Sequence, residues 1–349
     1  MLFRSFETPD AVLAIAERGG KLGGRDVQFV QIDDESDPAK APQNANRLVV
    51  GEKVDVLVGT VSSAVQAAMI RVAREEGTYL LIPNAGLNAG SRELCAPNIF
   101  RTSFSNWQPA YPMGKVMYDR GHRNVVTYAW KYAAGDESVG GFIEGFTQAG
   151  GKIVKELSLP FPDVEFQAQL TEIASLKPDA VFVFFAGAGA GKFVKDYDAA
   201  GLRRTIPLYG TGFLTDGVLE AQGAAAEGLM TTLHYVEDLD NAANKRFKDA
   251  FKAASKREAD VYAVQGYDTG LLLAQALDAV KGDIGARAEL IKATRAAKID
   301  SPRGPWTFSA SQNPVQDIYL REVRRGENRF VSVAHKALAD PGTGCRMPT

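Results

Sequence analysis

With 349 residues, the chain exceeds the size at which a single hydrophobic core usually stops growing, so two domains are expected. Hydrophobic residues make up 45% and charged residues 23% of the chain, which excludes disordered and fibrous proteins. Lysine and arginine number 40 against 42 aspartate and glutamate, so the sequence lacks the basic excess that would indicate nucleic acid as a partner.

No segment approaches the roughly 20 apolar residues of a membrane-spanning helix, so no span is expected. Residues 1–7 have neither the apolar region nor the cleavage site of a secretory signal, which by itself favours the cytoplasm. The two cysteines, Cys95 and Cys345, lack the spacing of a metal or redox motif. They are either buried thiols or one long-range disulfide.

From residue 26 onward, apolar β-branched runs alternate with longer amphipathic stretches, which is typical of βαβ units and a parallel sheet. The first half of the chain predicts strands at 26–32, 54–58 and 79–82 and helices at 38–51 and 63–76. No strand-like segment precedes the amphipathic run that begins at Asp10. The first strand of this α/β lobe is therefore expected to be missing.

After Pro97 the pattern restarts and predicts a second sheet. Its expected strands are 124–129, 152–159, 180–185, 206–209 and one near 229–235. The expected helices lie near 109–120, 137–149, 166–176 and 190–200. Two more helices at 242–256 and 259–281 are followed by a probable hairpin of 316–323 with 328–335.

A glycine-rich segment, 187–192, follows a predicted strand as a phosphate-binding loop would. A Walker motif requires Gly at Ala186 and Ser or Thr at Phe193, and a dinucleotide motif requires Gly at Lys192. We interpret the segment as a strand-to-helix turn beside a binding cleft. No nucleophile elbow is complete, and the three histidines, His122, His234 and His335, are scattered singly along the chain. We therefore predict no catalytic residue, no metal and no cofactor.

Ser62 and Ser63 follow a predicted strand at the start of the next helix, where N–H groups and the helix dipole attract an anion. Helix capping is the alternative role for these hydroxyls, and both roles are compatible. The segment 83–86 ends the following strand on the side where open α/β sheets bind ligands, although it is also a common turn sequence. Rings near strand ends or crossovers can enclose a flat ligand, but each taken singly is more typical of a core: Trp107, Trp130, Tyr132, Phe185 and Phe213.

These segments together resemble the branched-chain amino-acid (Leu/Ile/Val) type of solute-binding protein, the type I periplasmic family that serves ABC importers. The resemblance covers about residues 10–345. It rests on the order and spacing of short motifs at 19–25, 33–40, 53–59, 83–86, 95–102 and 266–268.

The resemblance implies two flavodoxin-like, three-layer α/β lobes that close by hinge motion on a small organic carboxylate and deliver it to a permease in the inner membrane. Three crossovers are expected near 103–106, 234–237 and 307–310. Lobe 1 would contain 1–104 and 236–308, and lobe 2 would contain 105–235 and 309–349.

In that family, the serine at the position of Ser63 and the backbone around Asn84 and Gly86 hold the carboxylate of the ligand. The turn at 132–135 and the loop from Ala186 line the other lobe. The ligand-binding residues expected from the resemblance and the sequence are Ser62, Ser63, Asn84, Ala85, Gly86, Trp107, Tyr132, Ala134, Ala188, Gly212 and Phe213.

Family members that bind α-amino acids carry an acidic residue for the ammonium group after the strand that corresponds to 206–209. Here that loop, 210–215, has none. Because a buried ammonium without a carboxylate is costly, we expect an acid without an α-amino group. The resemblance to binders that serve aromatic degradation favours a benzoate, hydroxybenzoate or phenylpropanoid.

Two alternatives remain. One is a binder or sensor of branched-chain amino acids or amides, and the other is an enzyme on the same α/β architecture.

Family members begin with a signal peptide and a central strand, and the sequence shows neither. We therefore expect a truncated chain whose native form is periplasmic. In that oxidising compartment a bridge between Cys95 and Cys345 is favoured. On the chain-entropy model it would contribute roughly 4–5 kcal/mol at most.

Overall fold

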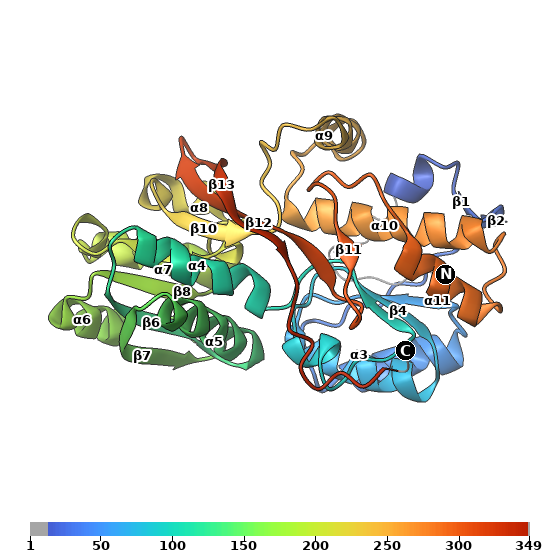
Figure 1. Cartoon of the computed structure of the whole chain (residues 1–349), viewed down its shortest axis with the longest axis horizontal. Helices are drawn as coiled ribbons and strands as arrows, with labels where there is room; N and C mark the ends of the chain where they lie inside the picture. Colours follow the sequence, from blue (N-terminus) through green and yellow to red (C-terminus); the bar gives the residue numbers. More distant parts are fainter. Residues whose placement is uncertain (1–12, 348–349) are drawn as a thin grey trace. The chain divides into compact units, whose positions relative to one another are not determined.

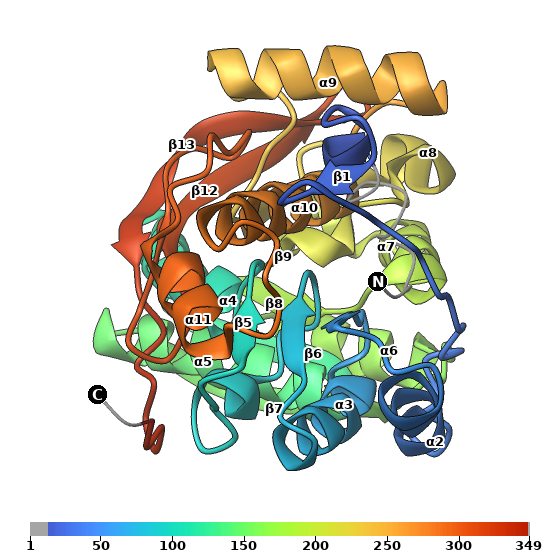
Figure 2. The same ribbon diagram turned by 90° about the vertical axis from the view of Figure 1, so that its right-hand side faces the viewer.

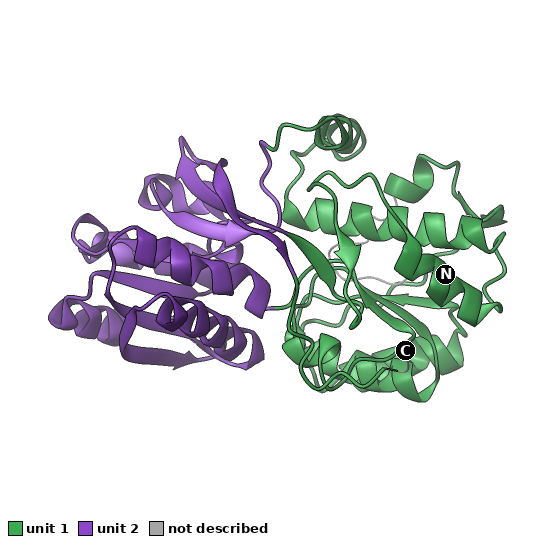
Figure 3. Cartoon of the chain, in the orientation of Figure 1, with its two compact units in different colours: residues 1–105, 239–316, 339–349 green, residues 106–238, 317–338 purple. Residues whose placement is uncertain are grey.

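The computed structural model describes residues 13–347 (Figure 1). Within this range the chain forms two compact units (Figure 3). Unit 1 consists of 13–105, Leu239–Gln316 and 339–347, and unit 2 consists of Asn106–Asp238 and Asp317–Leu338. The lobe boundaries expected from the sequence stay a prediction.

The described part of unit 1 contains a parallel three-stranded sheet in the order β3-β4-β5. Its strands are β3 (Val56–Val58), β4 (Tyr79–Ile82) and β5 (Ile99–Arg101). All residues of these strands are buried, which is typical of parallel strands that are covered on both faces.

Helices cover both faces of this sheet, as Figures 1 and 2 show for α3 and α10. Leu57 and Leu80 pack in one cluster with α2 and α3, whereas Val58 and Leu81 pack in another with α10 and α11. The helices of unit 1 are α2 (Ala41–Asn46), continued by the π-helical turn Arg47–Gly51, α3 (Ser63–Glu75), α9 (Ala242–Ser255), α10 (Val261–Ala279) and α11 (Arg287–Ala296).

The predicted strand 26–32 is wrong for most of its length. Only Arg25–Asp26 form a strand, β2, which pairs antiparallel with β1 (Lys21–Leu22), and Phe29 makes an isolated bridge. Beyond Asp26 the segment forms no continuous hydrogen-bonded ladder within the described part of the chain. Its side chains still divide between the two core clusters, with Val27 and Phe29 in one and Val30 and Ile32 in the other. The expected absence of a first strand concerns residues outside the described range.

Unit 2 contains a larger sheet in which β7, β6, β8, β9 and β10 run parallel in that spatial order. β12 pairs antiparallel with β10, and β13 pairs with β12. These strands are β6 (Asn124–Lys131), β7 (Lys152–Pro160), β8 (Ala180–Phe184), β9 (Leu208–Thr211), β10 (Met230–Leu233), β12 (Pro314–Arg324) and β13 (Glu327–Leu338). The first residues of β12 also pair with β11 (Thr307–Phe308).

The sheet of unit 2 is likewise enclosed by helices. Phe142 and Phe146 of α5 pack on one face together with α4, and Phe166, Leu170 and Phe193 pack on the other near α6 and α7. The helices are α4 (Trp107–Asp119), α5 (Ala133–Gln148), α6 (Gln167–Leu176), α7 (Gly187–Ala199) and the short α8 (Leu219–Gln222). Both units thus have the expected three-layer α/β arrangement.

The C-terminal segment 339–347 belongs to unit 1. A disulfide joins Cys345 to Cys95. The buried Asp340 carboxylate accepts hydrogen bonds from Arg92, at 3.1 Å, and from the Ser105 hydroxyl, at 2.6 Å. The tail is therefore held by one covalent bond and by a partly buried ion pair.

A second buried ion pair lies between α10 and the segment after α11. The Arg303 Nε lies 2.9 Å from Asp268 Oδ2, and both side chains are almost fully buried. Arg303 also donates hydrogen bonds to the carbonyl oxygens of Thr102, at 2.6 Å, and Ser103, at 3.3 Å. The pair therefore anchors the chain just beyond the carboxyl end of β5.

We predict that replacing both cysteines by serine, Cys95→Ser with Cys345→Ser, lowers the free energy of unfolding by about 2–5 kcal/mol. The bridge restricts the unfolded chain across a separation of 250 residues. Chemical denaturation measures the loss, and intact mass with and without reductant tests the bridge itself. Two free thiols in the untreated protein would refute it.

The buried Asp268 predicts a pH dependence of stability. Burial raises the pKa of Asp268 to about 6 although Arg303, Ser301 and Trp306 lower it. Because the folded state then holds a proton that the unfolded chain releases near its ordinary value of 3.8, the stability contributed by this group falls as the pH rises from about 4 to about 6.

Urea denaturation across that range should show a slope in the wild type that Asp268→Asn lacks. Between about pH 4 and about pH 6, the difference in free energy of unfolding between the two proteins should change by about 1–3 kcal/mol. Parallel profiles for the two proteins would contradict the raised pKa.

Candidate functional site

Parallel strands bring their carboxyl ends to one edge of a sheet, where open α/β sheets bind ligands. In unit 1 this edge begins where β3 leads into α3. Ser62 is the N-cap residue of α3, but its side chain makes no capping hydrogen bond to the helix, and Ser63 is the first helical residue and is buried. The structure therefore places both predicted serines at the helix N-terminus, and the Ser62 side chain does not make the capping bond that was its alternative role.

Asn84 follows β4 at the same edge and is almost fully buried. Its side-chain amide donates to Gln265 Oε1 at 2.8 Å, and its carbonyl accepts a hydrogen bond from the Ser103 hydroxyl at 3.0 Å. The Ala85 N–H donates to the Thr60 carbonyl at 2.8 Å. These bonds hold the segment 83–86, which contains the buried Gly86, against the ends of β3 and β5.

Sequence reasoning missed two residues that support this edge. Gln265 of α10 lies three positions before Asp268, so both side chains project from the same side of the helix. Gln265 holds Asn84, while Asp268 binds Arg303, which holds the chain at Thr102 and Ser103. The motif 266–268 indicated the helix, but nothing local in the sequence revealed these partners.

In unit 2 the corresponding edge carries a cluster of aromatic rings. Tyr132, the N-cap residue of α5, stacks on Phe161 with ring centroids 4.6 Å apart and lies 6.3 Å from the ring of Phe184. Burial raises the pKa of Tyr132, so its phenol is neutral at physiological pH. Ala134 lies in the first turn of the same helix and is buried. Sequence reasoning missed Phe161, which stacks on the predicted Tyr132.

The glycine-rich segment 187–192 forms the first residues of α7, and the turn from β8 into that helix consists of Phe185 and Ala186. Gly189 is required by packing, because a Cβ atom there would lie 2.3 Å from the indole ring of Trp130. Ala188 is exposed beside it. Gly189 therefore allows α7 to approach the Trp130 ring. The interpretation of 187–192 as a strand-to-helix turn is wrong, because the whole segment is helical.

Gly212 and Phe213 follow β9 in a short 3-10 turn, and both are buried. The Gly212 carbonyl accepts hydrogen bonds from the N–H groups of Thr215 and Asp216, both at 3.0 Å. Arg321 donates to the same carbonyl at 3.2 Å. This loop is therefore rigid and backed by a buried cation.

Trp107 lies elsewhere in unit 2, at the first residue of α4. Its ring stacks on Tyr111 with centroids 4.3 Å apart, its N–H donates to Glu144 at 2.8 Å, and it packs with Ile318 and Leu338. The structure therefore engages Trp107 in the packing of α4 against α5 and the long hairpin, rather than grouping it with Tyr132 and Phe161.

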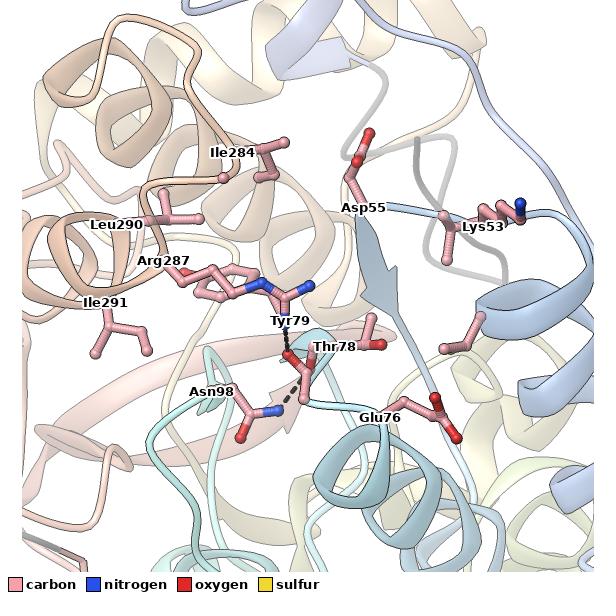
Figure 4. Close-up of a pocket in the computed structure, with 14 residues that line it drawn as sticks. Lys53, Asp55, Glu76, Thr78, Tyr79, Asn98, Ile284, Arg287, Leu290 and Ile291 are labelled. Carbon is pink, nitrogen blue, oxygen red and sulfur yellow. Dashed lines mark hydrogen bonds between the residues drawn. The ribbon is translucent and has the colours of Figure 1, made fainter.

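A cavity of about 370 Å³ in unit 1 lies at the opposite edge of its sheet (Figure 4). Its lining includes Asp55, Tyr79 and Asn98, which stand at or just before the starts of β3, β4 and β5. Arg287 points into it and donates to the Gly77 carbonyl. Because it lies at the amino ends of the strands, this cavity is not the expected ligand site.

Among residues 13–347 no group of three His, Cys, Asp or Glu side chains could hold a metal ion. His122 pairs with the Tyr209 hydroxyl at 3.0 Å, and burial lowers its pKa, whereas His335 lies exposed on β13. The arrangement offers serine hydroxyls at a helix N-terminus, main-chain groups and flat apolar rings, which suit binding.

Comparisons with known proteins agree with these features. A family model described as periplasmic binding protein matches residues 8–328. Leu/Ile/Val-binding protein homolog 6 of Brucella abortus (strain 2308) is 30% identical over 340 residues, which are 94% of this chain and 86% of that protein.

Two solved structures share the fold. The solute binding protein of an ABC transporter from R. palustris, in complex with benzoate, superposes with a TM-score of 0.95 at 49% identity and covers 99% of this chain and 98% of that chain. The one from Rhodopseudomonas palustris BisB5, in complex with 3,4-dihydroxy benzoic acid, has a TM-score of 0.89 at 31% identity, with 96% and 94% coverage.

The resemblance inferred from the motifs and the α/β fold class are thereby confirmed. These relatives are solute-binding proteins, and the enzyme alternative is not supported. The chain belongs to the periplasmic binding protein family.

Proposed function

We propose that this protein is the receptor of an ABC importer for a small aromatic carboxylate of the benzoate or hydroxybenzoate type. The observation that carries the proposal is the 49% identity, over nearly the whole of both chains, with a solute-binding protein in complex with benzoate. The relative in complex with 3,4-dihydroxy benzoic acid supports the same class of ligand.

In the proposed complex the carboxylate is bound at the edge of unit 1. Ser62 and Ser63 stand at the N-terminus of α3, a helix of 13 residues whose dipole favours a negative charge there. The rigid segment 83–86 borders this position. Hydrogen bonds from hydroxyl and main-chain N–H groups would replace the hydration that the anion loses on binding.

The carboxyl edge of unit 2 is itself proposed to bind aromatic groups. Tyr132, Phe161 and Phe184 offer flat apolar surface there, and offset or edge-on ring contacts are favourable beyond the area that they bury. The other residues proposed to line this edge are Ala134, Ala188, Gly212 and Phe213.

We further propose that the native protein works in the periplasm, closes by hinge motion on its solute and docks on a permease of the inner membrane. Family membership supports this assignment. In the described range, no helix combines the length and the apolar character needed to cross a bilayer. The alternative ligands are branched-chain amino acids, which the name of the Brucella relative suggests, or amides.

A thermal-shift panel tests the class of ligand. Benzoate and 4-hydroxybenzoate should raise the melting temperature, because a ligand at 100 times its Kd adds about 2.7 kcal/mol to the stability of the folded state. Leucine, isoleucine and valine should leave it unchanged. Stabilisation by leucine and not by benzoate would overturn the proposal.

The role of the serines is tested by Ser62→Ala and Ser63→Ala, with Ser255→Ala in α9 as the matched control. Each of the first two should weaken benzoate binding by about 1.5–3 kcal/mol, the value of a hydrogen bond to a charged group. Ser62→Ala should leave the melting temperature unchanged because its side chain does not cap α3. Calorimetric titration measures the affinities. A loss of stability of about 1 kcal/mol without loss of affinity would instead indicate a capping role for Ser62.

A further inference from the structure

Arg321 is a fully buried cation of unit 2. It lies on β12 opposite Thr231 of β10, and its side chain is fully buried. Its guanidinium binds Asp216 through both oxygens, at 2.8 and 3.2 Å, and its Nε donates to the Thr231 hydroxyl at 3.1 Å. A planar, two-pronged pairing of this kind fixes orientation as well as charge.

The same guanidinium holds two main-chain carbonyls. It donates to the Gly212 carbonyl and to the Tyr235 carbonyl, both at 3.2 Å. Gly212 belongs to the predicted ligand loop, and Tyr235 lies two residues beyond β10. Arg321 therefore determines where the loop 212–216 stands relative to the end of β10.

The pair also fills the space into which a side chain at position 212 would project. A Cβ atom on Gly212 would lie 2.6 Å from Arg321 Nη2, 2.8 Å from Asp216 Oδ2 and 2.6 Å from Leu233 Cδ2. The backbone of Gly212 has no positive φ, so its conformation does not itself require glycine. Any side chain there, including an acidic one, must displace the ion pair.

The loop does contain one acid, but its charge is compensated internally. Both oxygens of Asp216 accept from Arg321, and Asp216 Oδ1 also accepts from the Asn328 amide at 3.3 Å. The Asp216 side chain is fully buried. The loop thus presents no negative charge that could bind a ligand ammonium group.

We propose that Arg321 and Asp216 form a positioning pair that sets ligand specificity through Gly212, favouring carboxylates without an α-ammonium group. This inference rests on the proposed function. It extends that function by assigning the discrimination to two residues whose side chains are fully buried.

The test compares ligands that differ only by the ammonium group. Phenylacetate and phenylglycine form such a pair, and benzoate serves as the reference ligand, all measured by calorimetric titration. The wild type should bind benzoate and should prefer phenylacetate to phenylglycine by about a hundredfold or more, since an unpaired buried ammonium is costly. If the wild type binds phenylglycine better, the proposed function itself fails.

Arg321→Met leaves Asp216 uncompensated. Benzoate should then bind about tenfold more weakly or worse, and the preference for phenylacetate over phenylglycine should shrink by about tenfold. In Arg321→Met with Asp216→Asn, where both charges are absent, affinity should fall for both ligands while the preference stays at the wild-type value. A wild-type preference in the folded single variant would overturn the inference and leave the proposed function intact.

Gly212→Ala, with Gly140→Ala as its matched control, tests the steric part and does not depend on removing a buried charge. Gly140 lies in α5, and a Cβ atom there would meet nothing within 4 Å. Gly212→Ala should lower the melting temperature and should raise the Kd for benzoate by about tenfold. Gly140→Ala should change neither quantity. Unchanged benzoate affinity in Gly212→Ala would contradict a role for the filled space behind the loop.

Discussion

The parallel direction of the strands decides where this protein can bind a solute. Because β3, β4 and β5 run the same way in unit 1, and β6, β8 and β9 do so in unit 2, each sheet has one edge at which loops and helix N-termini gather. Such edges carry Ser62 and Ser63, the segment 83–86, the aromatic cluster around Tyr132 and the loop 212–216. The cavity of about 370 Å³ in unit 1 lies at the other edge and is lined by none of them.

A buried arginine lies near the carboxyl edge of the sheet in each unit. Arg303 pairs with Asp268 and holds the carbonyls of Thr102 and Ser103, and Arg321 pairs with Asp216 and holds those of Gly212 and Tyr235. Buried ion pairs often add little net stability compared with a well-packed apolar core. In both units the guanidinium also fixes geometry, because it donates hydrogen bonds to two main-chain carbonyls as well as to its carboxylate partner.

Local patterns predicted most of the fold because they reflect burial. The apolar runs at 79–82 and 180–185 correspond closely to β4 and β8, and the amphipathic run at 63–76 corresponds to α3. β5 was missed because its three residues directly follow Pro97 and Asn98, which indicate a loop. The strand predicted at 26–32 shows the reverse, since its side chains alternate between two cores without a ladder.

The candidate site was less accessible to sequence reasoning. Ser62, Ser63 and Gly212 could be found because they follow strands. Trp107 was predicted as a ligand-binding residue, and the sequence did not reveal its packing role because its partners Tyr111 and Glu144 become neighbours only when α4 packs on α5. Arg321 and Asp216 are 105 positions apart and meet only through the order of β9, β10 and β12. No spacing in the sequence indicates such a pair.

The bridge between Cys95 and Cys345 gives the molecule a closed covalent path. All of unit 2 lies between these two positions in the chain, as do residues Leu239–Gln316 of unit 1. A protease that cuts one peptide bond anywhere in this stretch opens the path but releases no fragment. Damage at a connection between the units would therefore leave every part of the protein attached until a reductant is present.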